Sequence, residues 1–162
     1  MDGINFRAAG LPEVYGEAEV MFQVVLINLF LLAVISEASV LNQVTKNILG
    51  EPLKIFSVKP MTGFYRDGYC RTGEEDSGTH VVAAIVDQKF LDYTKSKGND
   101  LQTPNLAFGF VGLKPGDRWC LCATRWKQAH EAGFAPAVDL EATHEKALEY
   151  ISLETLKLKK NK

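Results

Sequence analysis

Hydrophobic residues along the chain form two runs that predict central strands of a sheet. Residues 80–86 are almost continuously apolar and rich in β-branched side chains, which is typical of a strand buried on both faces. Residues 119–123 alternate instead, so a strand there places Trp119, Leu121 and Ala123 on one face and Arg118, Cys120 and Cys122 on the other. We expect the first of these faces to join the core and the second to line a site.

Two further strands are predicted at residues 53–58 and 137–142, the second of which would bury Val138, Leu140 and Ala142. Four short helices are predicted from capping residues and helical periodicity. Asp87 caps a helix that Gly98 ends, Gly133 ends a helix over residues 125–132, and Thr143 and Ser152 cap the last two helices. The residues expected to face inward from these helices are Phe90, Leu91, Thr94, Ala147, Leu148, Ile151, Leu153 and Leu156.

The order of these elements predicts the fold class. Strand and helix alternate three times after residue 79, which permits parallel crossovers. The first half of the domain is long and glycine-rich, with Gly63, Gly68 and Gly73 expected at special backbone dihedrals, and this favours a mixed sheet over a doubly wound one. We therefore predict an α+β fold, a single domain with a mixed β-sheet flanked by short helices and preceded by an apolar N-terminal helical segment.

That apolar segment covers residues 21–35 and is interrupted only by Gln23 and Asn28. It is shorter than the ~20 residues that a membrane-spanning helix needs. Its length matches the apolar part of a secretory signal, and Ser36-Glu37-Ala38 supplies small residues before a cleavage site, although the preceding residues are acidic. Three interpretations stay open: a signal or membrane anchor, a helix that packs on the domain or on a partner chain, and an artefact of gene prediction.

The predicted organisation is an N-terminal extension at 1–46, a compact domain at 47–157 and a basic tail at 158–162. We expect the domain to be cytoplasmic, or secretory or membrane-associated if residues 21–38 act as a signal. The 162 residues carry a formal net charge of −2 and cluster lysines only at the end, so no nucleic-acid partner is expected. Three cysteines form no even framework, which argues against a disulfide-stapled fold and for a reducing compartment.

The cysteines form the first candidate site. Cys120 and Cys122 would lie ~6.6 Å apart on one strand face, near the upper limit for an unstrained disulfide. Turned inward, they could share a divalent transition metal, for which the other candidate ligands are Cys70, His80 and His144. The spacing matches no paired zinc signature, so cysteines that only pack in the core are a competing interpretation.

Thiol chemistry at Cys122 is the third interpretation. A cysteine thiolate is favoured beside a cation or at a helix N-terminus. Arg118 lies on the same predicted face, and a helix is expected to begin near Thr124. His144, with Glu141 or Glu145, is the candidate base.

Short polar residues beside turns form a second candidate site, together with Trp119. They are Arg66, Asp67, Asn99, Asp100, Asp117 and Arg118. Such carboxylates and amides have a structural interpretation, because they hydrogen-bond the backbone of turns. The alternative is that they converge with Trp119 or Trp126 around a small ligand whose carboxylate or phosphate the arginines hold.

Several motifs, in order over residues 47–156, resemble one uncharacterised family of bacterial type. They are Thr62-Gly63-Phe64-Tyr65-Arg66-Asp67-Gly68, Cys70-Arg71-Thr72-Gly73, Gly98-Asn99-Asp100-Leu101, Gly112-Leu113-Lys114-Pro115-Gly116-Asp117-Arg118-Trp119-Cys120-Leu121-Cys122 and Leu140-Glu141-Ala142-Thr143-His144-Glu145. The family is the domain of unknown function two-two-three-seven. The resemblance implies a small soluble domain and brings no established activity. It also implies cysteines at the positions of Phe56 and Ala83, whose joint loss suggests that those two thiols act together in relatives, as a disulfide or as metal ligands.

The function predicted from these patterns is a small-ligand or metal-binding domain with its site at the Cys-x-Cys segment. One alternative is a non-catalytic structural or interaction module whose cysteines pack. The other is a thiol-dependent enzyme. In each case residues 21–35 are the expected point of contact with a membrane or a partner chain.

Overall fold

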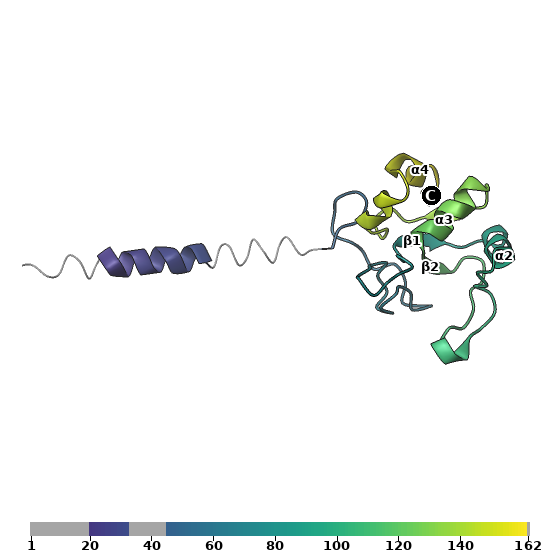
Figure 1. Ribbon diagram of the computed structural model, residues 1–162, viewed down its shortest axis with the longest axis horizontal. Coiled ribbons are helices and arrows are strands. Elements are labelled where there is room, and N and C mark those ends of the chain that lie inside the picture. Colours follow the sequence, from purple (N-terminus) through teal and green to yellow (C-terminus); the bar gives the residue numbers. More distant parts are fainter. Residues whose placement is uncertain (1–19, 33–44, 162) are drawn as a thin grey trace, which may run out of the picture. The chain divides into compact units, whose positions relative to one another are not determined.

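The computed structural model describes residues 20–32 and 45–161, and the chain divides into two units between Gln43 and Val44 (Figure 1). The first unit contains a helix at 20–32, which confirms that part of the predicted apolar helical segment is helical. The predicted cleavage-site residues 36–38 lie outside the described residues. Within the described ranges, no helix is long and apolar enough to cross a membrane.

The second unit is built on a three-stranded sheet whose central strand is β1 (Val82–Ile85). The strands β2 (Arg118–Leu121) and β3 (Ala137–Val138) pair with β1 on either side, and both pairings are antiparallel. The α+β prediction is confirmed, but the prediction of a mixed sheet is wrong for these strands. The N–H of Val86 donates to the carbonyl of Asp117 at 2.9 Å, so the chain re-enters the sheet at the end it left and β2 runs back along β1.

Three α-helices and one short 3-10 helix lie around this sheet, and a second 3-10 helix lies at the tip of a projecting loop (Figure 1). They are α2 (Gln88–Ser96), η1 (Leu106–Phe108), α3 (Ala123–Glu131), η2 (Glu145–Glu149) and α4 (Leu153–Leu158). Two predicted caps are confirmed, because the side chains of Asp87 and Ser152 accept hydrogen bonds from the first turns of α2 and α4. Phe90, Leu91 and Thr94 form the buried face of α2, as expected.

The third predicted cap is wrong. Thr143 does not begin a helix, because its hydroxyl donates to the carbonyl of Asp139 at 2.7 Å and accepts the N–H of Ala83 at 3.1 Å. His144 caps η2 instead, with its Nδ1 accepting the N–H of Lys146 at 2.9 Å. The shorter 3-10 repeat turns Leu148 outward, where it is 41% exposed, although Ala147 and Ile151 are buried as expected.

Two predicted strands are also wrong or shortened. Residues 53–58 form no strand, because the N–H groups of Phe56 and Ser57 share the single carbonyl of Gly68 rather than joining a ladder. β3 stops at Val138 because the Asp139 carboxylate turns the chain by accepting the N–H groups of residues 141 and 142. Burial of Val138, Leu140 and Ala142 is nevertheless confirmed.

The domain has a main core and a smaller second cluster on the other side of β2. Trp119, Leu121 and Ala123 belong to the main core, which confirms the predicted inward face. The second cluster consists of Phe56, Cys70, Ala83, Cys120 and Ala142. The positions of Phe56 and Ala83, where the family resemblance implies cysteines, therefore lie together in one cluster beside two cysteines of this chain.

Those two cysteines, Cys70 and Cys120, form a disulfide across a sequence separation of 50. This corrects the expectation that no disulfide staples the fold, and it removes the argument from cysteine number for a reducing compartment. It also removes the suggested pairing of Cys120 with Cys122, which stays free. The pattern of one strand could not reveal this partner, because Cys70 reaches the sheet from the irregular segment before β1.

We expect a chain lacking residues 1–44 to fold as a soluble monomer. The main core is composed of residues from Ile48 to Leu156, and the first backbone ties of the domain begin at Thr45, whose carbonyl accepts the N–H of Leu53. Size-exclusion chromatography and thermal unfolding would check this. Insoluble or non-cooperatively unfolding protein would show that the N-terminal helix is an integral part of the domain.

Replacing both disulfide cysteines by alanine should lower the free energy of unfolding by about 2–4 kcal/mol, because closing a long loop restricts the unfolded chain. Urea denaturation would measure the loss, and reduction of the unaltered protein should reproduce it. Reduction of the variant that lacks both disulfide cysteines is the matched control and should change nothing, since its remaining thiol, Cys122, is free. A denaturation midpoint unchanged by reduction would contradict the structural role of the bond.

Candidate active site

The free thiol lies where β2 passes into α3. Cys122 is the residue that precedes the first turn of α3, and it is partly exposed. Its side chain does not hydrogen-bond the helix it precedes. Its Sγ lies instead 3.1 Å from Nε2 of His80.

His80 lies in the loop before β1 and is held by a carboxylate on its other side. Its Nδ1 is 2.6 Å from Oδ1 of Asp76, and its backbone N–H donates to Oδ2 of the same carboxylate at 2.8 Å. Asp76, His80 and Cys122 thus form one continuous hydrogen-bonded array. Because Asp76 occupies Nδ1 of His80, Nε2 is the ring nitrogen that faces the Cys122 sulfur and can exchange a proton with it.

Asp76 is fully buried at its side chain. Burial by itself would raise the pKa of this carboxyl, but the backbone and side-chain hydrogen bonds and the charge of His80, with the hydroxyl of Thr72 at 2.9 Å, lower it below 3.8. The carboxylate is therefore ionised at neutral pH. It orients the imidazole and stabilises its protonated form.

Cys122 is the largest cause of a raised pKa at His80. Its hydrogen bond, followed by its charge and the contributions of Asp76, raises the pKa of His80 from 6.5 to about 9, against the opposing effect of burial. The imidazole between these two groups is consequently protonated at neutral pH. An imidazolium within hydrogen-bond distance is one of the surroundings that favour a cysteine thiolate.

Backbone geometry around His80 is unusual. Thr79, immediately before it, has φ of 48°, a left-handed conformation that β-branched residues rarely adopt. Gly78 leaves room for the ring, because a Cβ there would lie 2.4 Å from Cε1 of His80. The carbonyl of Thr79 accepts the N–H of Ala123 at 3.1 Å, which joins this loop directly to the first turn of α3.

The start of α3 adds positive potential near the thiol. An α-helix leaves the N–H groups of its first turn without partners inside the helix, and its N-terminus carries a partial positive charge. α3 is nine residues long, and its first N–H is taken by Thr79. The following N–H groups of the turn are the natural donors for negative charge that develops next to Cys122.

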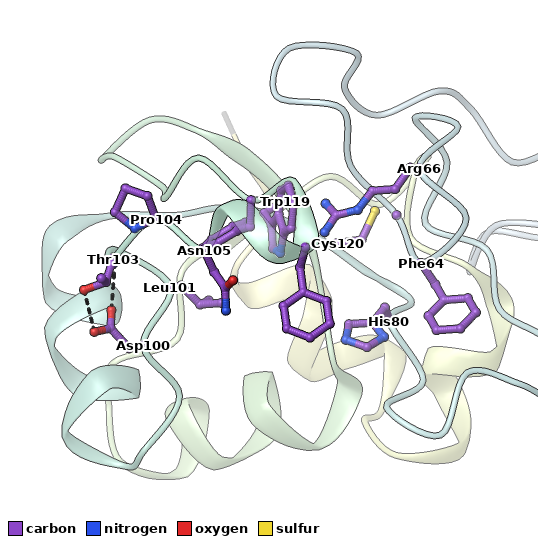
Figure 2. Close-up of a pocket in the computed structure, with 13 residues that line it drawn as sticks. Phe64, Arg66, His80, Asp100, Leu101, Thr103, Pro104, Asn105, Trp119 and Cys120 are labelled. Carbon is purple, nitrogen blue, oxygen red and sulfur yellow. Dashed lines mark hydrogen bonds between the residues drawn. The ribbon is translucent and has the colours of Figure 1, made fainter.

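His80 also forms part of the wall of a cavity of about 580 Å³. Figure 2 shows the ring beside Phe64, with Arg66 extending toward Trp119 and Cys120. The rings of Phe64 and His80 stack with centroids 6.1 Å apart. Because the side chain of His80 is 33% exposed, its imidazole is accessible to small molecules.

The predicted metal ligands are only partly brought together. His80 and Cys122 are in contact, but Cys70 and Cys120 are bonded to each other and have no thiolate to offer. His144 uses its Nδ1 to cap η2. Among residues 20–32 and 45–161, no three His, Cys, Asp or Glu side chains are grouped to hold a metal ion.

His144 was also the predicted base for thiol chemistry, in company with Glu141 or Glu145. In the structure the imidazole beside Cys122 belongs to His80, and Glu141 pairs with Lys54 at 2.6 Å. Burial lowers the pKa of His144, consistent with a neutral ring that accepts the Lys146 N–H. The geometry therefore moves the candidate base from His144 to His80.

The predicted polar turn residues separate into two groups. Asp67 and Asp117 accept backbone N–H groups of their own turns, and Asn99 donates to the hydroxyl of Thr94 in α2, which agrees with the structural interpretation. The guanidinium of Arg118 lies over Phe56 and pairs with Asp139 at 2.9 Å. The group that lines the cavity consists of Arg66, Asp100 and Trp119.

Asp76 is the functional candidate that sequence analysis missed. Its only local signal is the spacing of four residues to His80 within a polar, glycine-containing stretch. Such spacing has meaning on a helix, but this stretch is a loop. The turn that brings the two side chains together could not be predicted from a periodic pattern.

The fold and site define a small α+β domain that carries a cysteine, histidine and aspartate array beside a cavity. The chain belongs to the family described as "Uncharacterized protein conserved in bacteria (DUF2237)", whose model matches residues 46–160. This confirms the resemblance seen in the sequence motifs. No curated protein matches the chain.

We expect His80 to titrate near pH 9, with a midpoint that falls in Cys122→Ala because the thiol is the largest cause of the raised pKa. Imidazole NMR signals, assigned with His80→Asn, would measure both midpoints. Because the pKa of His80 is raised in the folded protein, its contribution to the free energy of unfolding is complete below pH 6.5 and is lost as the pH rises through about 9. A midpoint near 6.5 in the unaltered protein would contradict the array.

Proposed function

We propose that this protein is a thiol-dependent enzyme in which Cys122 is the nucleophile. The observation that carries the proposal is the continuous contact from Asp76 through His80 to the sulfur. Nucleophile, base and orienting carboxylate at hydrogen-bond distances are the arrangement that activates a weak nucleophile. The proposal keeps a small-molecule site beside the Cys-x-Cys segment and assigns it a chemistry.

Each residue has a defined role in this chemistry. His80 is already an imidazolium at neutral pH, so its Nε2 donates to the sulfur of Cys122, which reacts as a thiolate, and Asp76 holds the imidazolium through Nδ1. The thiolate attacks an electrophilic carbonyl carbon, and free N–H groups at the start of α3 stabilise the negative oxygen. His80 returns its proton to the leaving group, and the thioester on Cys122 is then released by water activated by the same imidazole.

The competing structural role fits these contacts less well. A cysteine that only packs is expected to be buried among apolar groups. Cys122 is instead partly exposed and in contact with an imidazole. A buried carboxylate and a strained backbone at Thr79 add costs that a purely structural histidine would not require.

Reaction with iodoacetamide at pH 6.5 tests the thiol. We expect Cys122 to be alkylated at least about tenfold faster than an ordinary thiol, and His80→Asn to abolish the advantage, because the thiolate fraction sets the rate. Gly78→Ala should also slow alkylation, since its Cβ displaces the His80 ring. His144→Asn is the matched control, in which asparagine can still cap η2.

A second measurement addresses acyl transfer. With p-nitrophenyl acetate, mass spectrometry should find one acetyl group on Cys122 and none in Cys122→Ser. An ordinary alkylation rate, unchanged by His80→Asn, would refute the proposal. Stoichiometric zinc or iron in untagged protein, lost on Cys122→Ser, would refute it in favour of metal binding.

A further inference from the structure

Arg66 presents a guanidinium in the wall of the cavity. Its backbone has φ of 54°, in a turn closed by its N–H on the carbonyl of Gly63 at 3.2 Å. Its Nη1 donates one long hydrogen bond, 3.3 Å, to the carbonyl of Met61. Within the described part of the chain, no Asp or Glu oxygen forms an ion pair with Arg66.

Neighbouring arginines differ in this respect. Arg71 pairs with Asp67, and Arg118 pairs with Asp139. Arg66 is instead positioned by an aromatic ring, because its guanidinium lies 4.7 Å from the centroid of Trp119 (Figure 2). Stacking on a ring fixes the plane of a guanidinium and leaves its edge N–H groups directed outward.

The remaining cavity wall is largely apolar. Phe64, Leu101 and Phe110 contribute to it, and the ring of Phe110 lies 5.5 Å from that of Trp119. The one carboxylate in the wall, Asp100, is occupied by the N–H groups of residues 102 and 103 and by Lys95. These bonds hold the pKa of Asp100 well below its usual range. Arg66 and the protonated His80 are the cations of this wall, and His80 is already paired with Asp76.

We propose that this cavity binds a small molecule with an apolar body and one carboxylate, which Arg66 holds in a bidentate contact. A single planar guanidinium matches the charge and shape of a carboxylate. The apolar body would lie against the aromatic walls, near the imidazole of His80. The binding site itself does not depend on the proposed thiol chemistry. The further statement that the substrate is an ester or thioester with a remote carboxylate rests on that chemistry.

The experiment is a calorimetric titration of the full chain, as Cys122→Ser to prevent reaction, with phenylacetate and with its neutral analogue phenylacetamide. We expect phenylacetate to bind at least about tenfold more tightly, since hydrogen bonds to charged groups contribute that much or more. Arg66→Gln should remove the difference. Arg66→Lys should keep part of it, because the charge remains and the fork geometry is lost.

Arg71→Gln is the matched control, because Arg71 lies five positions away, is not in the wall of this cavity and is paired with Asp67. Thermal unfolding of each variant would show that lost binding is not lost folding. Equal affinities for phenylacetate and phenylacetamide, or affinity unchanged in Arg66→Gln, would overturn the proposal. Preferential binding of phenyl phosphate would overturn the carboxylate assignment.

The two proposals fail separately. Selective phenylacetate binding in Cys122→Ser, together with ordinary alkylation of Cys122 in the unaltered protein, would leave the binding site standing and remove the thiol chemistry. Rapid alkylation and acylation of Cys122, without selective binding of phenylacetate, would do the reverse.

Discussion

The Cys70–Cys120 disulfide fastens a long irregular segment to the sheet. From residue 45 to residue 81 the chain contains no helix or strand, so it lacks a ladder to satisfy its buried backbone groups, which nonetheless require partners. A buried hydroxyl of this segment adds a second attachment next to the disulfide, since Oγ1 of Thr62 accepts the N–H of Cys120 at 2.8 Å. One covalent bond and one side-chain hydrogen bond thus meet at the same strand residue. Together with the bond from the N–H of Ala123 to the carbonyl of Thr79, they tie the loops that contribute to the site to β2 and α3.

The sheet register explains why the thiol and the imidazole meet. β1 and β2 are antiparallel, with Val82 opposite Leu121. In such a pair, one step toward the start of β1 corresponds to one step past the end of β2, so the residues before Val82 face those after Leu121. His80 precedes β1 and Cys122 follows β2, so both lie at the same end of this strand pair and outside its hydrogen-bonded ladder. Beyond the ladder, the N–H of Ala123 donates to the carbonyl of Thr79 at 3.1 Å, so the chain segments that carry the proposed catalytic pair stay joined.

Periodic patterns predicted the elements of this domain better than its site. The cap at Asp87, the buried face of α2 and the two central strands follow local rules of hydrogen bonding and alternation, and these are confirmed. The strand expected at 53–58 failed because its donors are satisfied by carbonyls of a distant loop, which no local pattern encodes. The alternation of one strand likewise placed Cys120 on a face with Cys122 but could not identify Cys70, its disulfide partner from the irregular segment. Asp76 is the clearest case, because its role depends on a loop that only tertiary contacts shape.

The two positions where the family resemblance implies cysteines lie apart from the proposed catalytic residues. Phe56 and Ala83 both belong to the second cluster, with the disulfide. Phe56 and Ala83 contribute only apolar side chains to that cluster. The guanidinium carbon of Arg118 lies 4.6 Å from the centroid of the Phe56 ring. Neither residue hydrogen-bonds a side chain of the array formed by Asp76, His80 and Cys122. A cysteine at either position would therefore join the cluster of the disulfide rather than the proposed catalytic site.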